Sequence, residues 1–303
     1  MFKRAIWAFA IAVCLAAPVT VHAQGNYLDV YIVKVKPEKL ADFQALGKKW
    51  VDANRRFNGD HWLASETMYG EGNVFVFTSP RQDYADIDKL SETGMQAVNK
   101  AFGKEATEKI LRDWESCLVW SRTELRRRRP DLSRKAPTDM DSYAKLIGES
   151  RVLRTTAVHV RPGHIADFEA LLKEAKEAGE KAANTQPVLV AQVVEGGKGT
   201  TFYVTVLRSS LGGFDKNPTL REILGEEGFK KYLQVNAEAV EGTESALFRF
   251  SPELSNPADE IVNVAADFWH PKAIMAAAAS KPKAATAEST ALKLKPAAEK
   301  PKQ

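Results

Sequence analysis

The sequence predicts an α+β fold made of two copies of one small unit, and three observations support this. The segment Val35–Leu46 returns as Val160–Leu171, with seven of the twelve aligned positions identical. This spacing is too long for a solenoid repeat, so it indicates two copies of a domain. Strand and helix patterns then follow each copy in the same order. Finally, segments 74–77 and 202–206 barely alternate between apolar and polar residues, which predicts strands covered on both faces.

The first copy contains four expected strands and two expected helical stretches. Segment 27–35 is rich in β-branched and aromatic residues, as strands are. Pro37 suits the first turn of a helix, and apolar residues then recur at three- and four-residue steps from Leu40 to Trp50. The remaining elements are strands at 61–69 and 74–78 around a turn at 70–73, a helical stretch at 91–114 broken near Gly103, and a strand at 116–123.

The second copy repeats this plan. A strand at 152–160 precedes a helix whose apolar stripe runs from Ile165 to Ala175. Strands at 187–195 and 200–207 flank a glycine-rich turn at 196–199, and a helix at 218–240 leads to a strand at 244–250. Each copy therefore reads β-α-β-β-α-β, the split arrangement of ferredoxin-like domains.

With these motifs the chain resembles the dimeric α/β-barrel superfamily. The likeness rests on the strand–Pro–helix motifs Val35–Phe43 and Val160–Phe168 and covers about residues 27–125 and 151–252. It implies tandem ferredoxin-like repeats that pair sheet to sheet as an intramolecular dimeric α/β barrel, hence a monomer acting as a pseudo-dimer. The superfamily includes cofactor-free monooxygenases, haem-degrading enzymes, haem peroxidases and stress-response proteins, and the fold alone does not choose among them.

The chain ends suggest export and a flexible tail. Lys3 and Arg4 precede a short apolar stretch, and Val21–Ala23 has the small-residue pattern of a cleavage site, so 1–23 is interpreted as a signal peptide. An uncleaved membrane anchor is the alternative, although the stretch is shorter than the ~20 apolar residues of a stable membrane span. We therefore expect a periplasmic or secreted protein. The expected parts are repeats at 24–125 and 151–257, a basic linker at 126–150, and a C-terminal extension at 258–303 that is Ala/Lys/Pro-rich and disordered from about 271.

The net charge of +4 does not indicate a nucleic-acid surface. Segment 271–303 holds seven lysines and two glutamates, so the mature chain before it is close to −3. The run Arg126–Arg129 is interpreted as a solvated connector, with contact to an anionic membrane surface or acidic partner as the alternative. It lacks the interleaved aromatic residues that single-stranded nucleic acid would require, so no nucleic-acid partner is expected.

Few residues are candidates for a site. Strand residue His159 matches Lys34 of the first copy, and both could anchor a ligand in a barrel lumen or simply form hydrogen bonds at its rim. His61 and Trp62 could hold an aromatic ligand or a haem, or could pack beneath a loop. Tyr203 lies on an expected strand. Histidine and carboxylate spacing predicts no metal site.

The sequence thus favours a protein that binds a small apolar or aromatic molecule in a barrel pocket, with no cofactor predicted. The alternative implied by the resemblance is a cofactor-free monooxygenase or a haem-binding or haem-degrading enzyme that uses His159 or His61, with Trp62 and Tyr203. Familiar catalytic signatures such as Gly-x-Ser-x-Gly and His-Glu-x-x-His are missing from the sequence, so the chemistry stays open.

Overall fold

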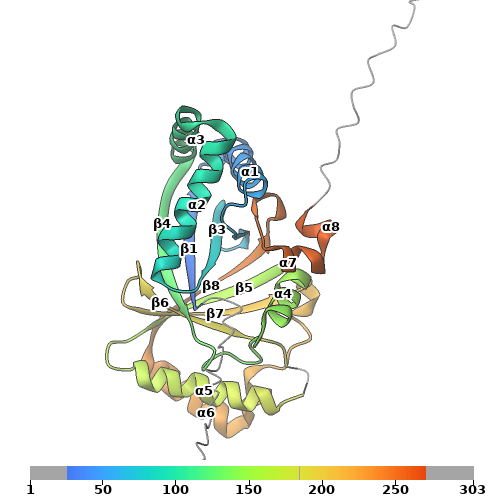
Figure 1. The fold of residues 1–303 in the computed structure, drawn as a ribbon. Coiled ribbons are helices and arrows are strands. Elements are labelled where there is room, and N and C mark those ends of the chain that lie inside the picture. The colour runs from blue at the N-terminus through green and yellow to red at the C-terminus, as the bar shows by residue number, and fades with distance from the viewer. Residues whose placement is uncertain (1–25, 184, 271–303) are drawn as a thin grey trace, which may run out of the picture.

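Eight antiparallel strands close a single barrel at the centre of the molecule (Figure 1). The computed structural model describes residues 26–183 and 185–270, so the expected signal peptide and the tail from 271 lie outside the described residues. Around the barrel the strand order is β1-β3-β2-β8-β5-β7-β6-β4. The strands are β1 Tyr27–Val35, β2 Leu63–Tyr69, β3 Val74–Arg81, β4 Leu118–Arg128, β5 Val152–Val160, β6 Leu189–Glu195, β7 Thr200–Arg208 and β8 Val240–Phe250.

The two halves of the chain have the same connectivity. In the first half the order is β4-β1-β3-β2, and in the second it is β8-β5-β7-β6. Two further antiparallel pairs, β2 with β8 and β4 with β6, join the halves. The halves therefore meet through hydrogen-bonded edges, and because the barrel is closed, none of its eight strands is left with an open edge.

Even the irregularities of the ladders correspond. The pairing of β1 with β4 shifts register between Lys34 and Val35, and the pairing of β5 with β8 shifts between His159 and Val160. These are matching positions of the repeated segment. The extra residue lies on the fourth strand in both halves, Val119 of β4 and Glu241 of β8. Such bulges bend a strand and increase its local twist, so β4 and β8 are irregular at matching places.

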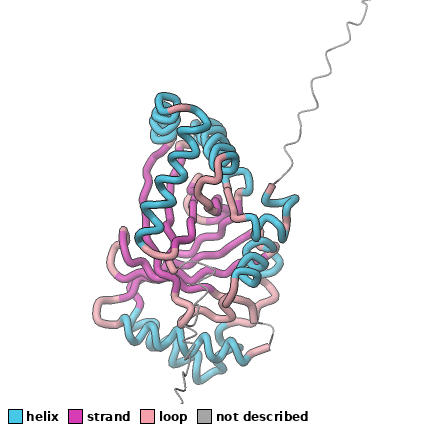
Figure 2. Tube along the Cα trace, viewed as in Figure 1, coloured by secondary structure: helices cyan, strands magenta, loops and turns pink. Residues whose placement is uncertain are grey.

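Helices cover the outside of the barrel on opposite sides (Figures 1 and 2). One group packs on the first half, a second on the second half, and a third, assembled from the segments that follow β4 and β8, packs beside them. The groups are α1 Leu40–Arg56, α2 Tyr84–Phe102 and α3 Lys104–Ser116; α5 Ile165–Lys181 and α6 Leu220–Ala239; and α4 Met140–Glu149, α7 Asp259–Val264 and α8 Ala266–Trp269.

The predicted apolar stripes are the inner faces of these helices. Phe43 of α1 is fully buried, with its ring centroid 4.9 Å from that of Phe75 on β3. In the second half Phe168 of α5 lies 5.2 Å from Phe202 on β7. Since alternate strand residues point to opposite faces, the outer residues of each strand hold the helices and the inner residues are left to form the lumen.

Three stretches differ from the expectation. Strand β4 runs to Arg128, so the interpretation of Arg126–Arg129 as a solvated connector is wrong: Arg126 and Arg129 are buried. The remainder of the expected linker contains helix α4. In the C-terminal extension, α8 ends at the fully buried Trp269, whose Nε1 donates to the Gly148 carbonyl at 3.1 Å.

Candidate functional site

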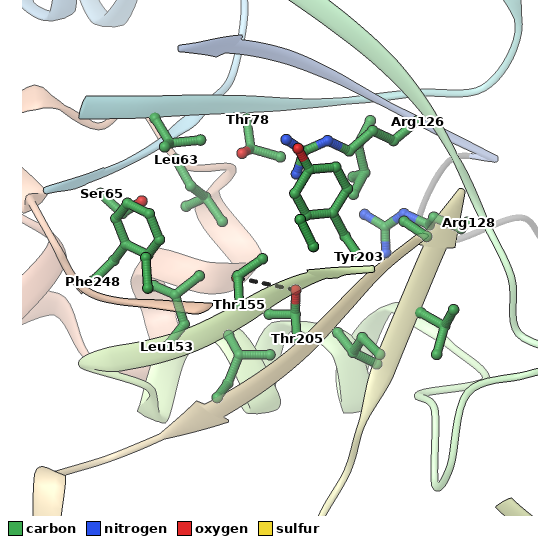
Figure 3. A pocket seen from close by; sticks show the side chains of 18 of the residues that line it. Leu63, Ser65, Thr78, Arg126, Arg128, Leu153, Thr155, Tyr203, Thr205 and Phe248 are labelled. Atoms are coloured by element: carbon green, nitrogen blue, oxygen red, sulfur yellow. Dashed lines mark hydrogen bonds between the residues drawn. The ribbon is translucent and has the colours of Figure 1, made fainter. Parts of the chain in front are cut away.

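The interior of the barrel forms a cavity, open to solvent, with a volume of about 1020 Å³. All eight strands contribute side chains to its wall, and the rest comes from Asn26, the turn between β2 and β3, the segment after β4, and helices α4 and α5. The wall is mixed, because apolar, hydroxyl and cationic side chains all face the same space. Figure 3 shows that these kinds are not intermingled: arginines and a tyrosine gather on one side, and leucine and phenylalanine on the other.

The cationic side lies where β4 meets β6, and we call it the arginine seam, made of Glu124, Arg126, Arg128 and Tyr203. Arg126 and Glu124 are both buried, with Arg126 Nε donating to Glu124 Oε2 at 2.9 Å. The guanidinium of Arg126 lies over the Tyr203 ring, 3.4 Å from its centroid (Figure 3). The Tyr203 hydroxyl donates to Glu124 Oε1 at 3.3 Å. Burial raises the pKa of Tyr203, so its phenol keeps its proton at neutral pH.

Arg128 extends the arginine seam toward helix α4. Its Nη2 donates to the Tyr143 hydroxyl at 3.2 Å, and its guanidinium lies 4.9 Å from the centroid of that ring. Each of the two arginines therefore rests on an aromatic ring, a contact worth up to about 2 kcal/mol when it is desolvated. Residue Arg122 continues the same face of β4 toward solvent, with Nε 3.4 Å from Glu124 Oε1.

The opposite side of the cavity lies where β2 meets β8, and we call it the phenylalanine seam, made of Leu63, Phe248 and Phe250. The pairing registers show how it relates to the arginine seam. Leu28 of β1 pairs with Arg126, and the matching Leu153 of β5 pairs with Phe248. Phe248 thus occupies in the second half the place that Arg126 occupies in the first.

Hydroxyl groups lie between the two seams. Thr155 and Thr205 share a hydrogen bond of 3.2 Å across β5 and β7, and Ser65 and Thr78 also line the cavity (Figure 3). A hydroxyl can donate or accept a hydrogen bond. This belt can therefore bind polar atoms of either kind along the length of a ligand.

Of the five residues singled out from the sequence, Tyr203 lines the cavity. Lys34 and His159 continue the lumenal faces of their strands but stand at the strand ends, each beside a glutamate that does line it. Lys34 forms an ion pair with Glu71, and His159 Nε2 lies 3.8 Å from Glu244 Oε1. The strands β1 and β5 lie across the barrel from each other, so the structure does not bring these two residues together.

The pair His61 and Trp62 lies outside the lumen. Trp62 is buried in the core between the barrel and α1, where its Nε1 donates to the Leu254 carbonyl at 2.7 Å. His61 is exposed, and its Nδ1 lies 3.3 Å from the Asn256 carbonyl oxygen. Trp62 therefore packs in the core while His61 stays at the surface, and neither residue lines the cavity.

The sequence reasoning missed Glu124, Arg126 and Arg128 because four consecutive arginines resemble a linker. A signal was nevertheless present: Arg122, Glu124, Arg126 and Arg128 alternate with other residues at the two-residue period of a strand. Continuing the fourth strand by five residues places all four on one face, and that face lies against the cavity.

The described side chains of the cavity wall fit neither a metal ion nor a haem. Within residues 26–183 and 185–270, no group of three or more His, Cys, Asp or Glu residues could hold a metal ion. The described cavity wall contains no His, Cys or Met, and the hydroxyls of Tyr143 and Tyr203 already hold hydrogen bonds. A haem in the barrel would lack a proximal histidine, cysteine or methionine. Cys117 is buried elsewhere, and burial raises the pKa of its thiol.

The closed eight-stranded barrel with helices on its outside is the architecture that the sequence resemblance implies. No protein-family model matches the chain, and no curated protein is significantly similar to it. In the described part, no helix has the length and apolarity needed to cross a membrane.

Solved structures of similar shape share little sequence with it. A protein with a provisional monooxygenase assignment from Fusobacterium nucleatum subsp. nucleatum has a TM-score of 0.48 at 12% identity, covering 74% of this chain and 91% of its own. An anthrone oxidase-like protein has a TM-score of 0.47 at 13% identity, covering 76% and 93%. A mutant chlorite dismutase from Candidatus Nitrospira defluvii has a TM-score of 0.45 at 10% identity, covering 80% and 97%.

Proposed function

We propose that this chain is a duplicated ferredoxin-like unit whose lumen binds one small organic molecule with an apolar or aromatic body. The observation that carries the proposal is the cavity of about 1020 Å³ inside a closed barrel. Eight-stranded barrels either fill their interior with side chains or hold one small ligand. Ligand pockets typically measure roughly 300–1000 Å³ and combine apolar walls with a few polar groups.

The lining supports a ligand of this kind. Leu63, Leu153 and Phe248 offer apolar surface on one side of the cavity. The hydroxyl groups between the two seams, such as those of Thr155 and Thr205, offer hydrogen bonds in the middle. Burying apolar ligand surface contributes about 25 cal/mol per Å². A molecule that covers the phenylalanine seam therefore gains most of its affinity there.

Two wider features belong to the same proposal. Both joins between the halves form within one chain, so we expect a monomeric barrel. The signal-like segment at 1–23 supports export, with ligand binding taking place in the periplasm or outside the cell. Sizing chromatography of the secreted chain checks the first expectation, and an obligate dimer would contradict it.

The lumen can be tested with the neutral dye Nile red. We expect its fluorescence to rise on binding the wild-type protein and this rise to be lost in Ala246→Phe, which fills the cavity from β8. The matched control is Thr243→Phe, on the same strand but exposed. Native mass spectrometry of protein from its own host should show a bound organic molecule. Equal dye binding by both variants would show that the dye does not occupy the lumen and would refute the proposal.

The alternative, a cofactor-free monooxygenase, adds a reaction to the same lumen. One observation favours it: the Tyr203 hydroxyl and the Glu124 carboxylate share a hydrogen bond in the arginine seam, and such a pair can move a proton at a bound ligand. Oxygen uptake that depends on the bound molecule and is lost in Tyr203→Phe would establish this activity. Binding without uptake leaves the protein as a binding module.

A further inference from the structure

The two seams differ in charge at matching positions. On β4 the lumenal positions are Arg122, Glu124, Arg126 and Arg128. The matching positions on β8 are Glu244, Ala246, Phe248 and Phe250. A ligand that lies across the barrel therefore meets guanidinium groups at one end and aromatic rings at the other.

From this arrangement we propose that the lumen ligand is an amphipathic organic anion, with a carboxylate head in the arginine seam and an apolar body against the phenylalanine seam. The inference rests on the proposed function and narrows it to a substrate class. Guanidinium groups present paired donors that match the two oxygens of a carboxylate. A neutral ligand could contact the phenylalanine seam but would form no charge-assisted hydrogen bonds with the guanidinium groups of the arginine seam.

The charge of the arginine seam favours an anionic head. The lumenal face of β4 carries three guanidiniums and one carboxylate, Glu124. Arg122 is half exposed, so water screens much of its charge. Inside the barrel, Arg126 and Arg128 present guanidinium groups to the cavity beside Glu124.

Both arginines are already held in place before a ligand arrives. Arg126 is fixed by Glu124 and the Tyr203 ring, and Arg128 by the ring and hydroxyl of Tyr143. Ordering a long side chain on binding costs about 0.5–1.5 kcal/mol, and groups already ordered avoid that cost. The seam is therefore prepared for an anion.

The test compares two probes of the same shape, 2-naphthoate and 2-naphthamide, by calorimetry on the full mature chain. We expect wild-type protein to bind the carboxylate about tenfold or more tightly than the amide, because charge-assisted hydrogen bonds are roughly twice as strong as neutral ones. Arg128→Gln and Arg126→Lys should each weaken naphthoate about tenfold and change naphthamide less than about twofold. Arg126→Lys keeps a positive charge beside Glu124, so we expect this variant to fold. Weaker naphthoate binding by it would then reflect the loss of the guanidinium group and not unfolding.

The matched control is Arg127→Gln. Arg127 lies on the same strand, one residue from both arginines, but its side chain is exposed outside the lumen. We expect it to bind naphthoate like wild type. Equal affinity of wild type for the two probes, or equal losses in Arg127→Gln and Arg128→Gln, would overturn the anion assignment while lumen binding stands. Failure of both probes together with Nile red would overturn the proposed function itself.

Discussion

The arginine seam and the phenylalanine seam are built by the same backbone pairing and differ in their chemistry. Each joins the fourth strand of one half to the second strand of the other, and register shifts occur in both. Yet the lumenal residues at matching positions are Arg126 and Phe248. The outer faces of these halves carry equivalent aromatic pairs, Phe43 with Phe75 and Phe168 with Phe202. Stability and ligand choice are therefore set on opposite faces of the same strands.

The largest expected change in the free energy of unfolding tests whether the matching aromatic pairs on the outer faces of the two halves contribute equally. Phe43→Ala and Phe168→Ala each remove a buried ring, so each should lower the free energy of unfolding by about 3–5 kcal/mol. Urea denaturation measures both. Losses that differ by more than about 2 kcal/mol, outside the usual spread for matched sites, would show that the halves do not contribute equally.

A smaller effect tests the difference between the seams. Glu124→Gln removes the carboxylate that holds Arg126, and a hydrogen bond to a charged group contributes about 1.5–3 kcal/mol. We expect a loss of about 2 kcal/mol in the ligand-free protein. If the seam binds anions, naphthoate should raise the melting temperature of Glu124→Gln more than that of wild type, whereas naphthamide should not. An unchanged melting temperature without ligand would mean that Glu124 does not stabilise the seam.

The smallest effect concerns a charge that only the second half carries. Arg129 forms ion pairs with Asp131 and Glu169, while the position of Glu169 in the first half is the uncharged Gln44. Hydrogen bonds from Arg129 lower the pKa values of both carboxyl groups. A carboxyl whose pKa is lower in the folded protein stabilises above its ordinary value, 4.5 for glutamate, and that stabilisation is lost as the pH falls below it.

Glu169→Gln should therefore lower the free energy of unfolding by about 1 kcal/mol at pH 7, a modest value because Glu169 is partly exposed. The loss should become smaller as the pH falls below about 4.5. Unfolding in urea at pH 7 and at pH 3 measures the change. A cost that stays the same at both values would mean that the contact acts through packing and not through charge.

Much of the fold follows from local patterns in the sequence. The repeated strand–Pro–helix segment, the stripe from Leu40 to Trp50 and the break at Gly103, which adopts φ +81°, correspond to elements of the structure. These features depend on residues close together in the chain. The sequence predicts a shorter β4 than the structure has, because arginines are typical of exposed segments. Contact with Tyr203 and Glu124 makes the burial of Arg126 favourable.

The site was harder to predict for the same reason. Which strand residues face a shared space depends on how β4 meets β6 and β2 meets β8, and these pairs join segments more than 60 residues apart. Tyr203 was singled out, while Arg126 and Phe248 were not. The burial of Trp269 was likewise missed, because its partners lie on α4 and β8, far from it in sequence.

The covalent connection between the halves has a consequence for how such a lumen can vary. In a homodimer every interior substitution would appear twice, so an arginine seam on one side of the barrel would face a second arginine seam on the other. Like charges that face each other across one cavity repel. With both halves encoded in a single polypeptide, Arg126 and Phe248 can change independently, and the interior can have a distinct head and tail.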